Sequence, residues 1–210
     1  MTPEPHEEQG DAPRFPAQVA VACHDLRTPL ATVYGFARTL ERLGGLDERQ
    51  MRYLGMVVAG AQELTRLIDD LATLTRLERG TQTVERGRVD LTELIDVVAT
   101  EAADRHAPGR TIYAPNHGRG FADTDHRLAQ SALSGLVDGA LRLDPHADRL
   151  ELRADGSSVL LGPLSGDALE LYGQADRDLR LTAARATFDA LEARVVVETG
   201  QLRVVFPPVT

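Results

Sequence analysis

The sequence has no lysine, no tryptophan and a single cysteine among its 210 residues. Without lysine, the chain can have neither a phosphate-binding loop ending in Gly-Lys-Ser/Thr nor a Schiff-base lysine. Because Cys23 stands alone, no internal disulfide can form, which is typical of a reducing compartment. Aromatic residues make up only 4% of the chain, so we expect cores of Leu, Val and Ala, mainly on helices.

The sequence also lacks a basic excess and long apolar runs. Its net charge is -9, and its arginines are scattered among acidic residues, so no surface is expected to bind the phosphates of a nucleic acid. No run approaches the roughly 18 apolar residues that a membrane span requires, and the acidic, proline-containing residues 1–13 are unlike a signal peptide. We therefore expect a cytoplasmic protein with no nucleic-acid and no membrane partner.

Apolar residues at spacings of three and four predict two long antiparallel helices in residues 15–79, after a disordered tail at residues 1–14. Gly44 and Gly45 are expected to end the first helix, and Asp47 to cap the second. Glu63, Asp69 and Asp70 are interpreted as a solvated helix face. The first seam comprises Val19, Ala22, Leu26, Leu30, Val33, Ala37 and Leu40, and the second comprises Leu54, Val57, Ala61, Leu64, Ile68 and Leu71.

Such a hairpin hides only one stripe of each helix, so pairing of two copies into a four-helix bundle is expected. Residues 80–88 lose this periodicity and are interpreted as a linker to a second domain at residues 89–210. That domain alternates helix and strand patterns, which predicts an α/β sandwich and an α+β chain overall. Its predicted helices are 91–104, 125–143 and 179–192, and its predicted strands are 111–113, 149–153, 159–161, 194–198 and 202–206.

His24 lies between two residues of the first seam, Ala22 and Leu26. Two residues along a helix turn it by about 200°, so the imidazole should point away from the seam. Asp25 can accept a hydrogen bond from one ring nitrogen, which leaves the lone pair of the other free to attack phosphorus. Thr28, one turn further along the same face, can orient a water. The simpler interpretation is an exposed histidine without a role.

The string His24-Asp25-Leu26-Arg27-Thr28-Pro29-Leu30 resembles the H-box of bacterial sensor histidine kinases. This resemblance implies that His24 is the phosphoacceptor and Asp25 its acid/base partner. It also implies that Thr28 corresponds to the residue that acts in dephosphorylating the partner response regulator.

The second domain resembles the ATP-binding domain of the same kinases in the order of its segments, but not at its ligand-bearing positions. Gly135 and Gly139 stand where the kinase N-box has two asparagines, and glycine has no side chain with which to hold Mg²⁺. Leu161–Leu164 lacks the acid that reads adenine, and Asp178 would repel phosphate at a helix N-terminus. The resemblance thus implies a degenerate ATPase-like domain, with no cofactor bound by this chain and no ATP-dependent autokinase activity.

These features predict a histidine phosphotransferase of a two-component phosphorelay, a homodimer that relays phosphoryl groups between response-regulator receiver domains through His24. Mg²⁺ would be supplied by the partner receiver, and no metal site is expected in this chain. A hybrid histidine kinase is a further candidate partner. Two alternatives remain open. The first is a divergent sensor kinase or pseudokinase, or a response-regulator phosphatase that acts through Thr28. The second is a non-catalytic dimeric binding scaffold.

Overall fold

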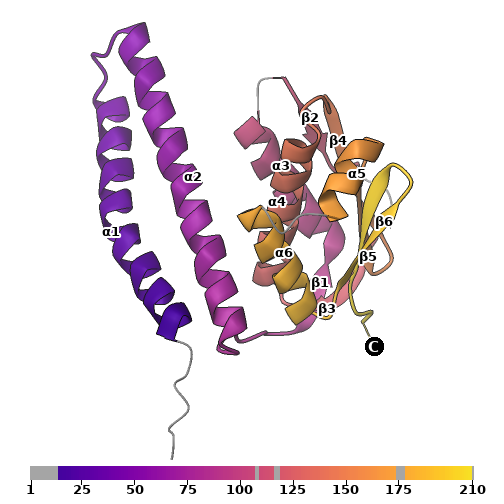
Figure 1. Ribbon diagram of the computed structural model, residues 1–210. Helices are drawn as coiled ribbons and strands as arrows, with labels where there is room; N and C mark the ends of the chain where they lie inside the picture. The colour runs from indigo at the N-terminus through magenta and orange to yellow at the C-terminus, as the bar shows by residue number, and fades with distance from the viewer. Residues whose placement is uncertain (1–13, 107–108, 116–118, 174–177, 210) are drawn as a thin grey trace, which may run out of the picture. The chain divides into compact units, whose positions relative to one another are not determined.

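The computed structural model describes residues 14–106, 109–115, 119–173 and 178–209 (Figure 1). The chain divides into two compact units, Met1–Arg79 and Gly80–Thr210, which are described separately below. Of the predicted tail at residues 1–14, all but Arg14 lies outside the described residues, and Arg14 is the first residue of a helix.

The first unit is a hairpin of two long helices, α1 (Arg14–Leu43) and α2 (Glu48–Glu78), as the seam pattern predicts (Figure 1). Gly44 and Gly45 follow α1 with φ of 69° and 78°, a left-handed conformation that glycine adopts without strain. Asp47 then caps α2, because its Oδ1 accepts from the Gln50 N–H at 2.8 Å while its own N–H donates to Gln50 Oε1 at 2.9 Å.

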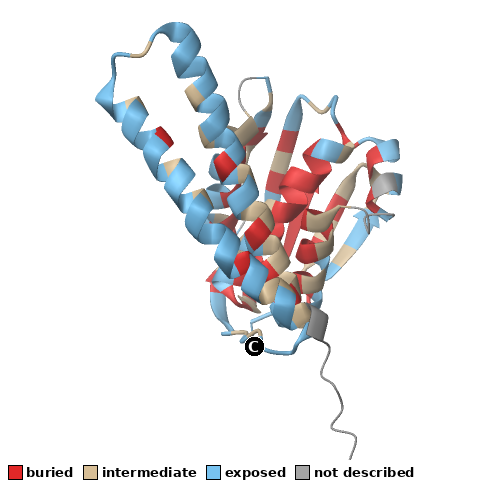
Figure 2. Ribbon diagram, turned by 60° about the vertical axis from the view of Figure 1, so that its left-hand side comes forward, coloured by how far each residue is buried: buried red, intermediate tan, exposed pale blue. Residues whose placement is uncertain are grey.

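Within the hairpin, the predicted seam separates into an inner and an outer line. Cys23, Ile68 and Ala72 are buried, and Val19, Leu30 and Leu71 pack against them. By contrast, Leu26, Val33 and Leu40 are each about half exposed. Figure 2 shows both long helices coloured mainly as exposed, with a few buried positions along them. The prediction that Leu26, Val33 and Leu40 lie on the packed stripe is wrong for the isolated chain, because two helices can cover only a narrow strip of one another.

The second unit contains two sheets. One pairs two strands antiparallel, and the other has five strands in the order β2-β4-β5-β7-β6, in which only the β2–β4 pair is parallel. The strands are β1 (Gly87–Asp90), β2 (Thr111–Tyr113), β3 (Phe121–Thr124), β4 (Arg149–Asp155), β5 (Ser158–Gly162), β6 (Arg194–Glu198) and β7 (Gln201–Val205). The helices are α3 (Leu91–His106), α4 (His126–Leu143), α5 (Gly166–Gly173) and α6 (Leu179–Ala190).

Helices α3, α4 and α6 lie together against one face of the five-stranded sheet, which is the predicted α/β sandwich (Figure 1). The core between the layers is aliphatic, with Phe188 of α6 meeting Phe206 edge to face at 6.1 Å between ring centroids. Aspartates start the three helices: Asp90 Oδ1 accepts from the Thr92 N–H at 2.9 Å, and Asp125 and Asp178 accept at 3.0 Å from the N–H three residues on.

Three short elements were not predicted: β1, β3 and α5. Each strand has four residues with too few apolar positions to show an alternating pattern, and α5 has eight residues. The β1–β3 pair is held instead by its ladder and by Arg88, whose guanidinium lies 4.1 Å from the Phe121 ring centroid. Strand β1 begins at Gly87, inside the segment 80–88 that the sequence predicts as linker.

Candidate functional site

The three candidate residues of the H-box-like string all lie on α1 and are exposed. The side chains of His24 and Asp25 are 80% and 71% exposed, and His24 Nδ1 lies 3.2 Å from Asp25 Oδ1. The predicted orientation of His24 away from the packed stripe is therefore correct. Since Nδ1 is the nitrogen that faces the carboxylate, Nε2 is the nitrogen left toward solvent.

Thr28 lies one helical turn after His24 and is exposed, as expected from their spacing. Its carbonyl oxygen accepts from the Thr32 hydroxyl at 3.0 Å. The Thr28 hydroxyl itself makes no hydrogen bond to another described residue. His24 and Thr28 thus present a ring nitrogen and a hydroxyl side by side on one exposed face.

Two contacts between the helices of the hairpin fix how this face is presented. Cys23, immediately before His24, is buried against Ile68 and Ala72 of α2, so the helix cannot rotate without exposing it. Arg27 donates to Asp69 Oδ1 from Nε at 3.2 Å and from an Nη nitrogen at 2.8 Å. Asp69 is exposed, as its interpretation as part of a solvated face predicts, but it is also paired with Arg27. The sequence offers no signal for a pair 42 residues apart.

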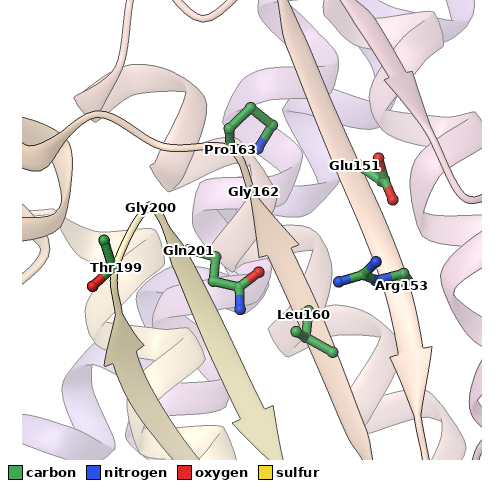
Figure 3. A pocket seen from close by; sticks show the side chains of 8 residues that line it. All are labelled: Glu151, Arg153, Leu160, Gly162, Pro163, Thr199, Gly200 and Gln201. Atoms are coloured by element: carbon green, nitrogen blue, oxygen red, sulfur yellow. The ribbon is translucent and has the colours of Figure 1, made fainter.

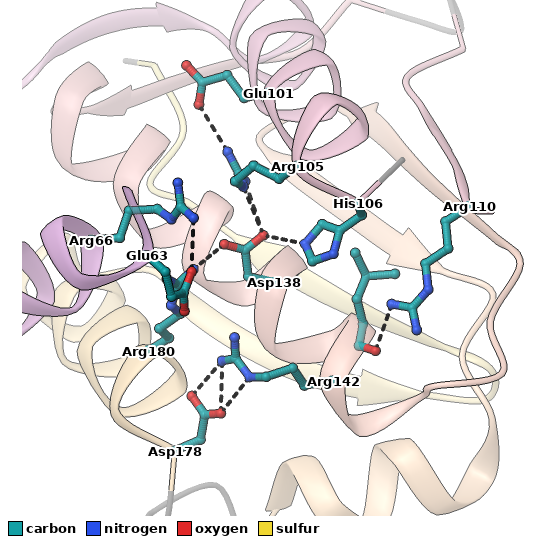
Figure 4. Close-up of polar contacts among 11 residues, drawn as sticks. Glu63, Arg66, Glu101, Arg105, His106, Arg110, Asp138, Arg142, Asp178 and Arg180 are labelled. Atoms are coloured by element: carbon teal, nitrogen blue, oxygen red, sulfur yellow. Dashed lines mark hydrogen bonds and ion pairs between the residues drawn. The ribbon is translucent and has the colours of Figure 1, made fainter. Parts of the chain in front are cut away.

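In the second unit, a buried carboxylate lies at the centre of a cationic cluster (Figure 4). Asp138 of α4 is 2% exposed and accepts from Arg105 at 3.1 Å and from Arg180 of α6. His106 Nε2 lies 3.0 Å from its Oδ1. Burial raises the pKa of Asp138, but the hydrogen bond to His106 and the charges of Arg105 and Arg180 outweigh burial and hold the pKa below its ordinary value.

The two glycines that stand at the N-box positions are sites of close helix packing. A Cβ on Gly139 would lie 2.2 Å from Cδ2 of Leu181, a fully buried residue of α6, and a Cβ on Gly135 would lie 3.3 Å from the Arg180 carbonyl oxygen. Leu181 therefore fills the volume that an asparagine side chain at position 139 would enter. Helix α6 rests on α4 because these two residues have no side chain.

Asp178, where the resemblance leads one to expect a glycine, has two partners of its own. Its carboxylate caps α6. It also forms a bidentate ion pair with Arg142 of α4, accepting hydrogen bonds from Nε at 2.9 Å and from an Nη nitrogen at 2.8 Å (Figure 4). The N-terminus of α6 is therefore occupied by a carboxylate from the chain itself, and that carboxylate is paired with a cation.

The segment Leu161–Leu164, which stands in place of the box that recognises adenine, spans the end of β5. Leu161 and Leu164 are buried in the core, and a Cβ on Gly162 would lie 2.9 Å from Gln201 Cβ. A hollow of about 320 Å³ opens beside it (Figure 3). It is lined by Glu151, Arg153, Leu160, Gly162, Pro163, Thr199, Gly200 and Gln201.

Two further classes of feature are absent from the described residues. No three His, Cys, Asp or Glu side chains there come together in a group that could hold a metal ion. Neither the two long helices nor any shorter helix of the described chain carries an apolar stretch that could cross a bilayer.

Residues 17–80 match the His Kinase A (phospho-acceptor) domain. The chain is 31% identical over 134 residues to the Sensor protein DivL of Caulobacter vibrioides, which covers 62% of this chain and 17% of DivL. It is 38% identical over 92 residues to the probable sensor histidine kinase TcrY of Mycobacterium tuberculosis, which covers 43% of this chain and 18% of TcrY. The chain thus spans less than a fifth of the length of these two proteins.

The fold has counterparts among solved structures. Full-length ShkA in complex with AMPPNP superposes with a TM-score of 0.57 at 22% identity, covering 93% of this chain and 47% of ShkA. The histidine kinase AdeS of Acinetobacter baumannii gives 0.54 at 18% identity, covering 89% of this chain and 98% of that one. Residues 17–80 thus match the His Kinase A domain, and the chain as a whole is similar in fold to histidine kinases.

Proposed function

We propose that the chain is a histidine phosphotransferase of a two-component phosphorelay, in which His24 takes a phosphoryl group from one receiver domain and gives it to another. The observation that carries this proposal is the exposed His24 imidazole, with Nδ1 at 3.2 Å from Asp25 Oδ1 and Nε2 open to a partner. The match of residues 17–80 to a phospho-acceptor domain supports it.

The chemistry follows from this geometry. With its proton on Nδ1 and shared with Asp25, the neutral imidazole attacks the phosphorus of a receiver aspartyl phosphate through Nε2. The new N–P bond forms as the acyl phosphate P–O bond breaks, and the receiver carboxylate leaves as an anion. In transfer to a second receiver, its carboxylate attacks and Nε2 leaves. Asp25 stabilises the positive charge that the ring carries while it holds the phosphoryl group.

The source of phosphate is another protein, not ATP. This step is supported by the packing of Leu181 over Gly139, which leaves no room for a metal-binding side chain on α4, and by the Asp178 carboxylate at the start of α6. Both features oppose the binding of a magnesium-nucleotide at this face. Mg²⁺ would instead come with the receiver domain, and no cofactor would be held by this chain.

In this proposal the chain is a cytoplasmic homodimer whose partners are receiver domains. A hybrid histidine kinase is a candidate upstream donor of the phosphoryl group. Dimerisation is supported by an apolar line that the hairpin leaves about half exposed on both helices. The line comprises Leu26, Val33 and Leu40 on α1 and Val57 and Leu64 on α2.

A second activity at the same site is dephosphorylation of a receiver. The exposed Thr28 hydroxyl, one turn from His24 and without a hydrogen-bond partner among the described residues, favours it. In that reaction the hydroxyl would orient a water toward the receiver's phosphoryl group, and His24 would not be phosphorylated.

The proposal is tested by phosphoryl transfer from a labelled receiver. Wild-type chain should acquire an acid-labile label from a phosphorylated receiver, whereas His24→Gln should acquire none. His126→Gln is the matched control, since His126 is an exposed histidine at the start of α4, and it should be labelled like wild type.

A second arm replaces the receiver with γ-labelled ATP and Mg²⁺. We expect no label and no heat of binding in calorimetry. Label on His24 from ATP alone would identify an autokinase, and failure of every receiver to label the wild-type chain would favour a binding scaffold.

A further inference from the structure

Strand β6 forms one edge of the five-stranded sheet and has no neighbour among the described strands on its outer side (Figure 1). It reads Arg194-Val195-Val196-Val197-Glu198, and Val196 and Val197 are 43% and 50% exposed. An edge strand with three consecutive valines is a template for pairing with another chain unless a charge or a bulge protects it. Its charges stand only at the two ends.

The backbone of β6 offers pairing groups in a defined pattern. The Phe206 N–H donates to the Ser157 carbonyl at 2.9 Å on the β5 side, so alternation turns the backbone groups of Val205 and Arg203 toward β6. Their partners in β6 are Arg194 and Val196. The N–H and C=O groups of the intervening Val195, and by the same alternation of Val197, therefore point outward.

The sequence of β6 is complementary to itself in the antiparallel direction. When two copies are aligned about Val196, Arg194 lies opposite Glu198 of the second copy, and Val195 lies opposite Val197. Each opposed pair lies on a single face of the joined sheet, because side chains alternate with a period of two. The outward groups of Val195 and Val197 are the ones this register pairs.

The charged residues at the two ends of β6, Arg194 and Glu198, can also form ion pairs between the two copies. Arg194 is exposed and has no hydrogen bond or ion pair with another described residue. Glu198 accepts from Arg203 and Gln201, each at 2.6 Å, yet its side chain is still 32% exposed. A carboxylate has about four lone-pair sites, so Glu198 can accept from a further guanidinium.

We propose that β6 is a self-association site, at which two copies of this chain join their sheets antiparallel about a two-fold axis at Val196. This contact uses no residue of the hairpin, so it is independent of the dimer proposed above. A chain with two different two-fold contacts forms assemblies larger than a dimer.

Proline at position 197 tests the contact with little effect on the fold. It removes only the outward N–H, and proline is tolerated on an edge strand where the N–H faces solvent. Val197→Thr is the matched control, since it keeps the branched shape and the N–H. Both changes are made in full-length chain carrying Val57→Asp and Leu64→Asp, so that the exposed line of the hairpin cannot contribute.

Sedimentation equilibrium is then measured from micromolar to millimolar concentration. The Val57→Asp/Leu64→Asp chain should dimerise, and adding Val197→Thr should leave its dimer dissociation constant within threefold. Adding Val197→Pro should give a monomer with an unchanged circular dichroism spectrum. A monomer throughout in the parent chain, or dimerisation of Val197→Pro like its parent, would overturn the proposal. Neither result bears on His24.

A charge swap tests the register. Arg194→Glu alone places two glutamates opposite each other at both ends of the joint, and Glu198→Arg alone places two arginines there. Mixing the two variants restores opposite charges at both ends. The mixture should associate at least tenfold more tightly than either variant alone, whereas equal association in all three samples would contradict the antiparallel register.

Discussion

His24 and Thr28 lie on one exposed face of α1, but the two reactions proposed there make different demands on them. Transfer needs the Nε2 lone pair, whereas dephosphorylation needs an oriented water. Thr28→Ala should therefore lower receiver phosphatase activity by on the order of 100-fold and leave phosphoryl transfer within about threefold of wild type.

Thr32→Ala is the control for the Thr28 experiment, because Thr32 is an exposed threonine one turn further along α1. It should change neither rate, as measured with a labelled receiver. Equal loss of transfer in Thr28→Ala and His24→Gln would show that the two residues do not have separate roles.

Asp138 is a buried carboxylate whose pKa is held below its ordinary value, so it links stability to pH. Its contribution is complete above the unfolded-state pKa of about 3.9 and is lost as pH falls through the lower folded pKa. Asp138→Asn should lower the unfolding free energy by about 3–5 kcal/mol at pH 7, because it removes the buried negative charge that pairs with Arg180 and Arg105.

Urea unfolding between pH 2 and pH 7 measures this effect. The acid limb of the stability curve should be flatter in Asp138→Asn than in wild type. Asp155→Asn is the control, since Asp155 pairs with Arg203 at an exposed position, and it should cost less than about 1 kcal/mol. An equal loss in both variants would mean that burial of the carboxylate is not what matters.

At the scale of elements, the contact between α4 and α6 depends on residues without side chains. Gly139→Ala would place a methyl group 2.2 Å from Leu181 Cδ2, so Leu181 must move within a filled core. Overpacking costs about 1–3 kcal/mol, of which about 1 is offset by the higher helix propensity of alanine. We expect a net loss of up to about 2 kcal/mol in chemical denaturation.

Gly135→Ala provides the comparison on the same helix. Its new methyl group would lie 3.3 Å from the Arg180 carbonyl oxygen and 3.4 Å from Ala184 Cβ, which is tight but not overlapping. We expect its stability to stay within about 1 kcal/mol of wild type. A larger loss in Gly135→Ala than in Gly139→Ala would contradict this account of the interface.

The sequence predicts elements whose signal is local. The long helices follow from apolar spacing, from Gly44 and Gly45 and from the Asp47 cap, and the candidate residues follow from the seven-residue string around His24. The strands β1 and β3 escape prediction because four residues carry no period. The Asp138 cluster also escapes it, since its charges come from three helices and are separated by 32 to 42 residues.

At the scale of the whole molecule, what one chain leaves uncovered indicates how it assembles. The hairpin buries Cys23 and Ile68 but leaves Leu26, Val33 and Leu40 of α1 about half exposed, at intervals of seven residues. A seven-residue apolar interval on each of two helices is the pattern of a bundle seam. Each helix of a four-helix bundle packs against two neighbours. The buried residues of the hairpin provide the contact within one chain, and the half-exposed residues would provide the contact with a second copy.

The proposed hairpin dimer is therefore tested on its outer line. Val57→Asp with Leu64→Asp would bury four unpaired carboxylates in the bundle, at a cost of several kcal/mol, so the Kd should rise at least 100-fold. Ile68 is unsuitable as a target because it is buried within the hairpin itself. Gln62→Asp is the control, since Gln62 is exposed and lies about 200° around α2 from Leu64. Sedimentation is measured in the Val197→Pro chain, so that β6 cannot contribute. A dimer that survives Val57→Asp/Leu64→Asp, or one that Gln62→Asp weakens equally, would place the interface elsewhere on the chain.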